Sequence, residues 1–265
     1  MVSKPVQYAL IGNPLGHSFS PEYFNSMFRE KGIQAEYVLR QLPSIDALTE
    51  MIENMPELRG FNVTIPYKRD IIFHLDKLDE TASHVGAVNT VKVIRDNGKT
   101  TLKGYNTDVA GFLRALTKFL KENVSESHPY PERALILGTG GASAAVAYAL
   151  DKLNIKYLFL TRSKELSGQM CQSEKVIEYS DLSPELIYEH RLIINTTPAG
   201  MYPDTLAAPP FPWEYLSKHH FFFDLIYNPT QTLAMRISAA HGAKTTNGLE
   251  MLHAQADAAW EIWQK

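Results

Sequence analysis

Three groups of polar residues follow short apolar segments in the first 110 residues of the chain. They are rich in hydroxyl and amide side chains, and two of them also contain Lys68 or Asp108. Ligand-binding residues often lie on loops that a rigid scaffold positions, so these groups predict a site for a small polar ligand. The groups occupy residues 12–21, 62–68 and 104–108.

A glycine-rich turn at residues 138–143 directly follows the apolar segment 134–137. A strand that turns into a helix in this way exposes backbone N–H groups beside the positive end of the helix dipole, which suits a pyrophosphate. Gly138 and Gly140 allow a tight turn and a close approach, while Ser143 stands where the usual dinucleotide fingerprint has its third glycine. A glycine-capped turn without a ligand is the alternative interpretation.

The next expected strand ends at Thr161, Arg162 and Ser163. An enzyme that uses NAD typically has Asp or Glu here, about 20 residues after the glycine turn. In this chain the first carboxylate comes later, at Glu165. A guanidinium can bind a 2′-phosphate, which a carboxylate would repel, so NADP is favoured over NAD. A solvated strand end remains the alternative.

Size and composition favour two moderate domains and a small partner. The chain has 265 residues, of which 45% are hydrophobic, and a net charge of −3. No long run of one charge sign indicates a nucleic-acid or polyanion surface. One large domain is the competing interpretation of the length.

The cysteine and histidine residues indicate neither a disulfide nor a metal site. Cys171 is the only cysteine, and His219, His220 and His253 have no partner at the spacing of metal ligands. No apolar segment approaches the roughly 20 residues that span a bilayer, and none forms a signal-peptide core. A cytoplasmic protein without membrane contact is therefore expected.

The hydrophobic pattern predicts an α/β protein in which strands and helices alternate. Ser20 is the expected N-cap of the first helix, Pro21 its first residue, and Gly32 the residue after its end. Asn97 and Gly98 predict a tight hairpin turn. Strands are expected over residues 7–11, 36–42, 61–65, 88–94, 100–103, 133–137, 157–160, 192–195 and 221–225, and helices over 21–31, 44–55, 108–121, 141–153 and 248–264.

The chain resembles the shikimate dehydrogenase family. Eight motifs of that family occur here in the family's order, and together they cover nearly the whole chain. One such motif could be chance, whereas eight in order could not. They lie at residues 12–14 with 17–21, 62–66 with Lys68, 86–90, 106–108, 138–143, 195–200, 224–229, and 248–252 with Gln255.

The resemblance implies reversible, NADPH-dependent reduction of 3-dehydroshikimate to shikimate in aromatic amino-acid biosynthesis. It implies a substrate domain with a mainly parallel sheet, at residues 1–107 plus 247–265, and a Rossmann-like NADP-binding domain at 108–246. The active cleft would lie between these domains. The expected cofactor is NADP, the partner is the small substrate, and the protein is a monomer or homodimer.

The resemblance also implies a role for individual residues. The substrate carboxylate would be bound by Ser18 and Ser20, with help from Tyr227. The ring hydroxyls would be bound by Asn62, Thr64, Lys68, Asn89, Asp108 and Gln255. The cofactor would be bound by Gly138, Thr139, Gly140, Gly141, Ala142, Ser143, Thr161, Arg162, Ser163, Thr196 and Gly248.

Lys68 and Asp108 are the expected catalytic residues. Lys68 can donate a proton or a hydrogen bond as negative charge develops on the substrate oxygen, and Asp108 can orient the ammonium. Without the resemblance, Lys68 would be interpreted as a surface lysine and Asp108 as a helix N-cap. Which of the two transfers the proton stays open.

Two departures from the family pattern concern the cofactor. Thr161 replaces the usual asparagine at the strand end, and Lys164 stands near the place of a second arginine. A quinate or quinate/shikimate dehydrogenase that uses NAD is therefore one alternative. A non-catalytic ligand sensor with the same fold is another. His17 is expected to have a structural role in its loop.

Overall fold

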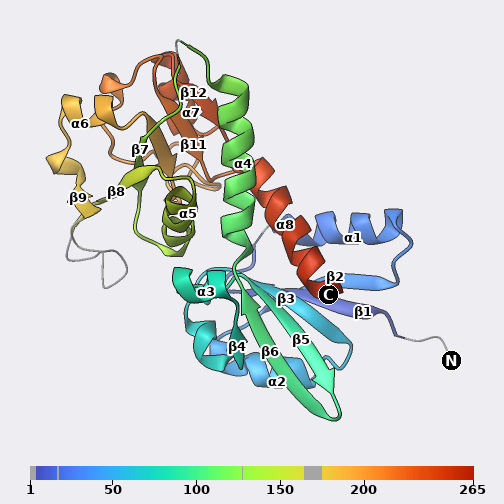
Figure 1. The fold of residues 1–265 in the computed structure, drawn as a ribbon. Helices are drawn as coiled ribbons and strands as arrows, with labels where there is room; N and C mark the ends of the chain where they lie inside the picture. Colours follow the sequence, from blue (N-terminus) through green and yellow to red (C-terminus); the bar gives the residue numbers. More distant parts are fainter. Residues whose placement is uncertain (1–3, 17, 127, 164–174) are drawn as a thin grey trace. The chain divides into compact units, whose positions relative to one another are not determined.

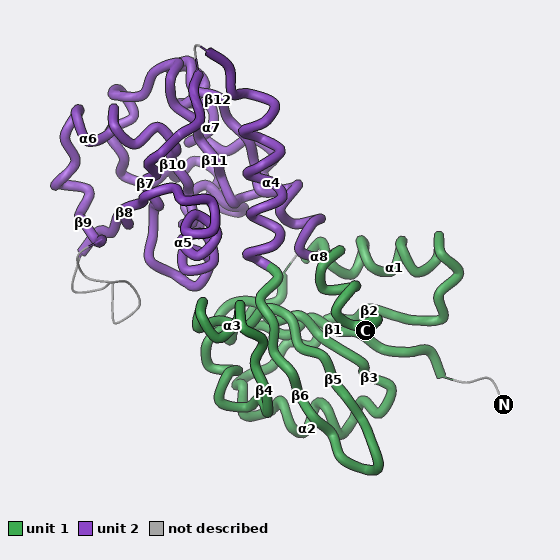
Figure 2. Tube along the Cα trace, viewed as in Figure 1, with its two compact units in different colours: residues 1–107, 256–265 green, residues 108–255 purple. Residues whose placement is uncertain are grey.

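The computed structural model describes residues 4–16, 18–126, 128–163 and 175–265, so His17, Lys164, Glu165 and Cys171 lie outside the described residues. The chain forms two compact units, Met1–Thr107 with Ala256–Lys265, and Asp108–Gln255 (Figure 2). We call them unit 1 and unit 2. The assignment of substrate binding and cofactor binding to separate domains stays a prediction.

Unit 1 contains a six-stranded sheet in which a parallel part meets an antiparallel hairpin (Figure 1). Strand β1 pairs in parallel with β2 and β3, whereas β5 pairs antiparallel with β3 and β6. In sheet order the strands are β2 (Ala35–Gln41), β1 (Val6–Gly12), β3 (Leu58–Val63), β5 (Thr90–Asp96), β6 (Lys99–Tyr105) and β4 (Lys77–Leu78).

The two faces of this sheet pack against different helices, which are α1 (Ser20–Glu30), α2 (Leu48–Glu53) and α3 (Glu80–Val85). On β1, Tyr8 and Leu10 face a cluster with Phe24 and Phe28 of α1. The alternate residues of β1 belong to a second cluster, which contains residues of α2 and α3. A strand that is buried on both faces has a nearly continuous apolar sequence, which explains why β1 contains few polar residues.

The predicted hairpin is confirmed. Strands β5 and β6 are joined by Asn97 and Gly98, which have φ angles of 47° and 78°. Positive φ at both positions suits the right-handed twist of the paired strands, and asparagine and glycine tolerate it best. These two residues therefore predicted the pairing of β5 with β6.

The prediction that Ser20 caps helix α1 is wrong. The helix begins at Ser20 itself, and its N-cap is Phe19, whose side chain makes no capping hydrogen bond. Ser18 acts locally instead, because its Oγ accepts a hydrogen bond from the Ser20 backbone N–H at 3.3 Å. The predicted helix over residues 44–55 is also divided, into a 3₁₀ turn (Ile45–Ala47) and α2.

Unit 2 contains a sheet of six parallel strands. In sheet order they are β12 (Lys244–Thr246), β11 (Phe221–Asp224), β10 (Leu192–Asn195), β7 (Arg133–Leu137), β8 (Lys156–Thr161) and β9 (Val176–Glu178). Its helices are α5 (Gly141–Lys152), α6 (Pro184–Glu189) and α7 (Leu233–Ala240). The unit also includes most of α4 (Thr107–Asn123) and the first part of α8 (Leu249–Gln264).

Strand β11 shows how this second sheet is buried. Phe222 belongs to a core cluster with Leu135, Ile193 and residues of α6 and α7. Phe223 instead contacts Phe112 of α4, with ring centroids 5.1 Å apart. These elements confirm the α/β fold class, with one mixed and one wholly parallel sheet.

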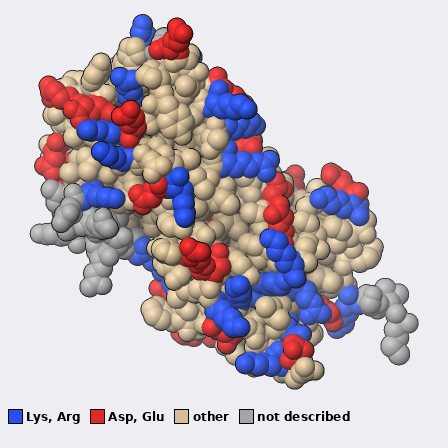
Figure 3. Space-filling view, viewed as in Figure 1, with Lys and Arg blue, Asp and Glu red and all other residues tan. Residues whose placement is uncertain are grey.

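The surface has both signs of charge. On the face shown in Figure 3, basic and acidic side chains lie among uncharged ones over both units. In the described residues, no helix is long and apolar enough to cross a membrane.

Candidate active site

The first two polar groups of the sequence meet at neighbouring strand ends in unit 1. Strands β1 and β3 are parallel, so their carboxyl ends lie at the same edge of the sheet. The Thr64 N–H donates to the Ile11 carbonyl at 2.9 Å, and a Cβ on Gly12 would lie 2.5 Å from Cγ2 of Thr64. Glycine at position 12 therefore allows the two loops to pack together.

Asn62 and Asn89, both predicted to bind substrate, are joined in a hydrogen-bond network. Nδ2 of Asn62 donates to the Asn89 carbonyl at 3.2 Å and to Oγ1 of Thr90 at 3.0 Å. Oδ1 of Asn89 accepts from the Thr107 N–H at 2.7 Å, and its Nδ2 donates to Oγ1 of Thr107 at 3.0 Å. Partners on several sides fix the orientation of both amides, as a specific site requires.

This network extends to the first turn of helix α4. Thr107 is 2% exposed and is followed by Asp108, which is 3% exposed. Helix α4 begins at Thr107, so Asp108 is its second residue rather than its N-cap. The helix dipole stabilises a carboxylate in the first turn of a helix. A buried carboxylate also needs polar partners, because burial without them is energetically costly.

Lys68 is held through its backbone close to the same network. Its carbonyl accepts a hydrogen bond of 2.6 Å from the N–H of Val88, the residue before Asn89. Its side chain is partly buried, in contrast to the surface position expected without the resemblance. The Ser18 and Ser20 side chains are also partly buried in unit 1.

Tyr37 is a member of this network that the sequence analysis missed. Its hydroxyl donates to Oδ1 of Asn62 at 2.8 Å. The Tyr37 side chain is 2% exposed, and this burial raises the pKa of its hydroxyl. An aromatic residue within a strand is ordinarily a core residue, so its type does not indicate this contact.

In unit 2, the predicted glycine turn connects β7 to α5. Gly138 has a φ of 107°, and a Cβ there would lie 3.0 Å from Oγ1 of Thr196. The hydroxyl of Ser143, which is fully buried, donates to the Gly140 carbonyl and so stabilises the turn by a side-chain hydrogen bond. Glycine at 138 is therefore required both by its backbone conformation and by its neighbour.

The remaining predicted cofactor residues follow the strands on either side of β7. Leu137, the last residue of β7, is paired with Leu160 of β8 and Asn195 of β10. Thr161 ends β8, and Thr196 directly follows β10. Strand order reverses at β7, and ligands of open parallel sheets bind at such a point, beyond the carboxyl ends of the strands.

Arg162 is exposed at this edge. Burial raises the pKa of Tyr179 to about 12, and the positive charge of Arg162 opposes that rise. Thr161 serves the local turn, because its Oγ1 donates to the Ser163 carbonyl at 3.0 Å. The guanidinium thus extends from a turn that is itself hydrogen-bonded.

Asn195 and Asp224 form a buried pair that supports two of the predicted loops. Nδ2 of Asn195 donates to Oδ1 of Asp224 at 3.0 Å, and Oδ1 of Asn195 accepts from the Thr197 N–H at 3.0 Å. Oδ1 of Asp224 also accepts from the Ile226 N–H at 3.0 Å. Burial raises the pKa of Asp224 to about 6, although these donors favour its charged form.

The same loop positions Tyr227 and Gly248. The Gly248 N–H donates to the Ile226 carbonyl at 3.1 Å, and a Cβ on Gly248 would lie 2.0 Å from the Leu225 carbonyl oxygen. The Tyr227 side chain is partly buried, which raises the pKa of its hydroxyl. Gly248 is therefore needed for backbone packing, whatever it contributes to cofactor binding.

Replacing Gly248 should destabilise the protein, whereas replacing Gly140 should not. We expect Gly248→Ala to lower the free energy of unfolding by about 1–3 kcal/mol, because the added methyl overlaps the Leu225 carbonyl. A Cβ on Gly140 meets nothing within 4 Å, so Gly140→Ala is the matched control. Urea unfolding of both variants measures the difference, and equal stabilities would contradict the packing described here.

Asp108 and Gln255 both lie where α4 crosses α8. A Cβ on Gly111, three residues after Asp108, would lie 2.8 Å from the Met251 carbonyl and 3.0 Å from Cβ of Gln255. The absence of a side chain at Gly111 lets the two helices approach closely. This places Gln255 near the N-terminal end of α4.

The edge of the unit 2 sheet fits a dinucleotide phosphate. Cβ atoms on Gly140 and Gly141 would meet no atom within 4 Å, and these residues open the 12-residue helix α5. Backbone N–H groups at such a helix start bind anions. Arg162 adds a positive charge at the neighbouring strand end.

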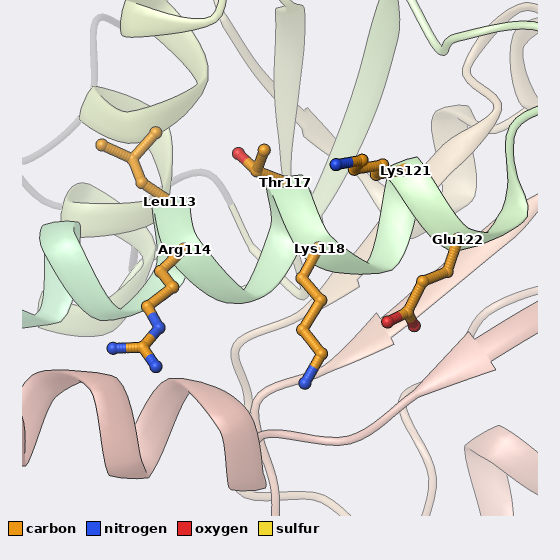
Figure 4. Close-up of a pocket in the computed structure, with 6 residues that line it drawn as sticks. All are labelled: Leu113, Arg114, Thr117, Lys118, Lys121 and Glu122. Carbon is orange, nitrogen blue, oxygen red and sulfur yellow. The ribbon is translucent and has the colours of Figure 1, made fainter.

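A hollow of about 740 Å³ lies elsewhere, along α4 (Figure 4). Arg114 and Lys118 extend from one side of the helix there, and Lys118 pairs with Glu250 at 2.8 Å. This pairing lowers the pKa of Glu250. None of the predicted site residues lines the hollow, which is bordered by exposed charged side chains and has the features of a solvated helix face.

The sequence and structure can be compared with known proteins. A family model described as the shikimate dehydrogenase substrate binding domain matches residues 10–91. The NADP(+)-dependent shikimate dehydrogenase of Caldanaerobacter subterraneus is 37% identical over 269 residues, which cover 97% of this chain and 90% of that protein. The chain belongs to the shikimate dehydrogenase family.

Solved structures of this family share the fold. The shikimate 5-dehydrogenase of Thermus thermophilus, in complex with NADP(H) and shikimate, has a TM-score of 0.79 and 31% identity, covering 97% of this chain and 93% of that one. The quinate dehydrogenase of Corynebacterium glutamicum, in complex with NAD, has a TM-score of 0.84 and 25% identity, covering 98% and 93%. The fold is thus shared by proteins named for different substrates.

The family model covers the predicted substrate residues from Ser18 to Asn89. Within unit 1 the structure joins Asn62 and Asn89 in one network with Tyr37, and it places Thr64 and Lys68 on the adjoining loop. Within unit 2 it places the predicted cofactor residues at the carboxyl edge of the sheet and in the adjoining loops. Their roles in binding remain predictions.

In the described part of the chain, no group of three or more His, Cys, Asp or Glu residues could hold a metal ion.

Proposed function

We propose that the protein is an NADP-dependent shikimate dehydrogenase that reversibly reduces 3-dehydroshikimate to shikimate in aromatic amino-acid biosynthesis. The observation that supports it best is the hydrogen-bond network in which Asn62 and Asn89, both inside the matched substrate-binding segment, are held by Tyr37 and Thr107. Amides and hydroxyls suit a polyhydroxylated ring because ring hydroxyls both donate and accept. The 37% identity to an NADP(+)-dependent shikimate dehydrogenase supports the same activity.

The substrate is bound through its two kinds of polar group. Ser18 and Ser20 hold the carboxylate, with help from Tyr227. The ring hydroxyls are bound by Asn62, Thr64, Lys68, Asn89, Asp108 and Gln255. An analogue that lacks a hydroxyl leaves one of these groups unpaired, which is a strong basis for rejecting it.

Lys68 and Asp108 form the catalytic pair. As the substrate carbonyl is reduced, negative charge develops on its oxygen, and the Lys68 ammonium stabilises that charge by a hydrogen bond or by proton donation. Asp108 orients the ammonium and the substrate hydroxyl. In the reverse direction the same two groups stabilise the loss of the hydroxyl proton.

The residues at the edge of the unit 2 sheet hold the cofactor. When bound, NADP supplies the nicotinamide ring that exchanges hydride with the substrate carbon. Residues 138–143 bind the pyrophosphate through backbone N–H groups, and residues 161–163 bind the adenosine ribose, with Arg162 on its 2′-phosphate. Thr196 and Gly248 border the rest of the cofactor.

The proposed substrate domain contains residues 1–107 and 247–265, and the proposed dinucleotide domain contains residues 108–246. The enzyme acts as a monomer or homodimer in the cytoplasm, on a small-molecule substrate and without nucleic acid.

A quinate dehydrogenase that uses NAD is the second candidate. The TM-score of 0.84 to the quinate dehydrogenase of Corynebacterium glutamicum favours it. Against it stands Arg162, since residues 161–163 contain no carboxylate that could bind the NAD ribose. A non-catalytic ligand sensor is less favoured, because Lys68 and Asp108 are both present.

A matrix of two substrates and two cofactors tests the proposal. Oxidation of shikimate and of quinate is followed by nicotinamide absorbance, each with NADP and with NAD. We expect kcat/KM to be highest for shikimate with NADP. Comparable turnover of quinate with NAD would overturn the assignment, and no turnover of any pair would favour the sensor.

A further inference from the structure

Asp224 is a buried carboxylate that takes no part in the proposed reaction. It is the last residue of β11, its side chain is fully buried, and both of its oxygens accept hydrogen bonds. Oδ1 accepts from Nδ2 of Asn195 and from the Ile226 N–H, both at 3.0 Å, and Oδ2 accepts from the Thr232 hydroxyl at 2.7 Å. A buried carboxylate is costly unless donors surround it, so all three donors matter for keeping it in the core.

The same carboxylate holds both ends of the loop between β11 and α7, which contains residues 225–231. Ile226 stands near the beginning of this loop, and Thr232 directly follows its end. Thr232 is also the N-cap of α7, because its Oγ1 accepts from the Met235 N–H at 3.2 Å. One fully buried hydroxyl, that of Thr232, therefore joins the end of the loop both to the helix and to Asp224.

Tyr227 belongs to this loop and directly follows Ile226. Its side chain is partly buried, which raises the pKa of its hydroxyl. Within the part of the chain that the structure describes, this hydroxyl has no hydrogen-bond partner. The phenol thus keeps its hydrogen for a ligand, which agrees with its proposed role in binding the substrate carboxylate.

Other segments also contact the loop, but through single backbone carbonyls. The Asn228 carbonyl accepts from the Tyr202 N–H at 3.2 Å, and the Thr230 carbonyl accepts from Nδ2 of Asn247 at 2.8 Å. These contacts should keep the loop in place when the Thr232 hydroxyl is removed. The expected consequence is a less precise loop conformation and not an unfolded protein.

We propose that Asp224 is a positioning residue that holds the loop of residues 225–231 in the conformation in which Tyr227 can bind the substrate carboxylate. The inference rests on the proposed function, in which Tyr227 contributes to carboxylate binding. Asp224 acts through the loop and contacts neither substrate nor cofactor. Its loss therefore changes affinity for the substrate and not the rate of the chemical step.

Removal of the Thr232 hydroxyl opens the end of the loop and leaves Asp224 bonded to Asn195 and Ile226. We expect Thr232→Val to raise KM for shikimate about three- to tenfold, which corresponds to the loss of one hydrogen bond. We expect kcat and the KM for NADP to stay within about twofold of wild type. Steady-state kinetics measures these constants at pH 8, where Asp224 is ionised because its pKa is about 6.

Two control variants separate positioning from general stability. Thr232→Ser keeps the hydroxyl and should restore KM for shikimate to within about twofold of wild type. Ser183→Ala removes the N-cap of α6, whose Oγ accepts from the Leu186 N–H at 3.2 Å, and Ser183 contacts no proposed binding residue. Loss of either cap destabilises a helix of unit 2, so a purely structural effect would raise KM in Ser183→Ala as well.

Asp224→Asn tests the carboxylate itself with almost no change of shape. The amide oxygen can still accept from Asn195 and Ile226, but the amide nitrogen then faces Thr232 and cannot accept its hydrogen. We expect the same rise in KM for shikimate as in Thr232→Val. The variant with both substitutions should show no further rise beyond about twofold, because both break one hydrogen bond.

The same cycle with Tyr227→Phe shows whether the loop acts through the Tyr227 hydroxyl. We expect Tyr227→Phe to raise KM for shikimate, and Thr232→Val to add less than about twofold in that background. An unchanged KM in Thr232→Val, an equal rise in Ser183→Ala, or an undiminished effect of Thr232→Val beside Tyr227→Phe would overturn the positioning role. Failure of the proposed function is distinct, because the wild-type protein would then not turn over shikimate.

Discussion

Lys68→Ala is expected to lower kcat for shikimate oxidation by about 10²–10⁴-fold, while KM for shikimate changes by less than about threefold. The interaction of the ammonium strengthens as charge develops on the substrate oxygen, so its loss is felt mainly in the transition state. The local backbone should persist, because the hydrogen bond from Val88 is accepted by the carbonyl of residue 68 and not by its side chain. Steady-state rates with saturating NADP measure the effect.

Lys99→Ala provides the control for loss of a positive charge. Lys99 is exposed at the β5–β6 turn and contributes to no proposed binding group. Its replacement should leave both kinetic constants unchanged. Wild-type kcat in Lys68→Ala would remove Lys68 from the mechanism, and a rise in KM alone would make it a binding residue only.

Arg162→Ala should weaken NADP binding by ~1.5–3 kcal/mol, a rise in Kd of about 10- to 150-fold, while NAD binding changes little. The difference arises because only NADP has the 2′-phosphate that the guanidinium can bind. Arg162 is exposed, so its removal leaves no cavity in the core. Titration of each cofactor against the purified variant measures both constants.

Arg133→Ala is the matched control for this cofactor experiment. Arg133 begins β7, at the end of the strand opposite the glycine turn, and pairs with Glu189 at the surface. Its loss removes the same charge from unit 2 and should not alter binding of either cofactor. Equal losses for NADP and NAD in Arg162→Ala would show that Arg162 does not recognise the phosphate.

Local signals in the sequence were enough for much of the fold. Asn97 and Gly98 predicted a hairpin because few residues tolerate the φ angles that such a turn needs. The glycine turn at residues 138–143 was placed correctly between β7 and α5, since apolar residues, a Gly-x-Gly and a helical pattern follow one another there. Both features are determined by residues that are adjacent in the chain, and such local patterns can be recognised directly in a sequence.

The misassigned features depend on tertiary contacts. Ser20 has the residue type of an N-cap, yet its backbone is already helical and Phe19 stands at the N-cap position. The short strands β4 and β9, of two and three residues, are too brief to show a hydrophobic period. They form because a neighbouring strand supplies the pairing.

The candidate site shows the same difference between features with a local sequence signal and features that depend on tertiary contacts. Residue types and motifs identified the proposed binding groups, but not the residues that hold them in place. Tyr37 resembles any aromatic strand residue, and Asp224 follows an apolar strand with nothing to indicate its contacts with Asn195, Ile226 and Thr232. Supporting residues are recognised by their partners, which the sequence does not show.

A crystal structure of the protein with shikimate and NADP⁺ bound is the most direct test of the central claim, that Lys68 and Asp108 form the catalytic pair. The account predicts that Ser18 and Ser20 contact the carboxylate, and that Lys68 and Asp108 both lie within hydrogen-bonding distance of the hydroxyl that is oxidised. Shikimate bound without contact to Lys68, or Lys68 and Asp108 on separate groups far from the nicotinamide, would contradict it.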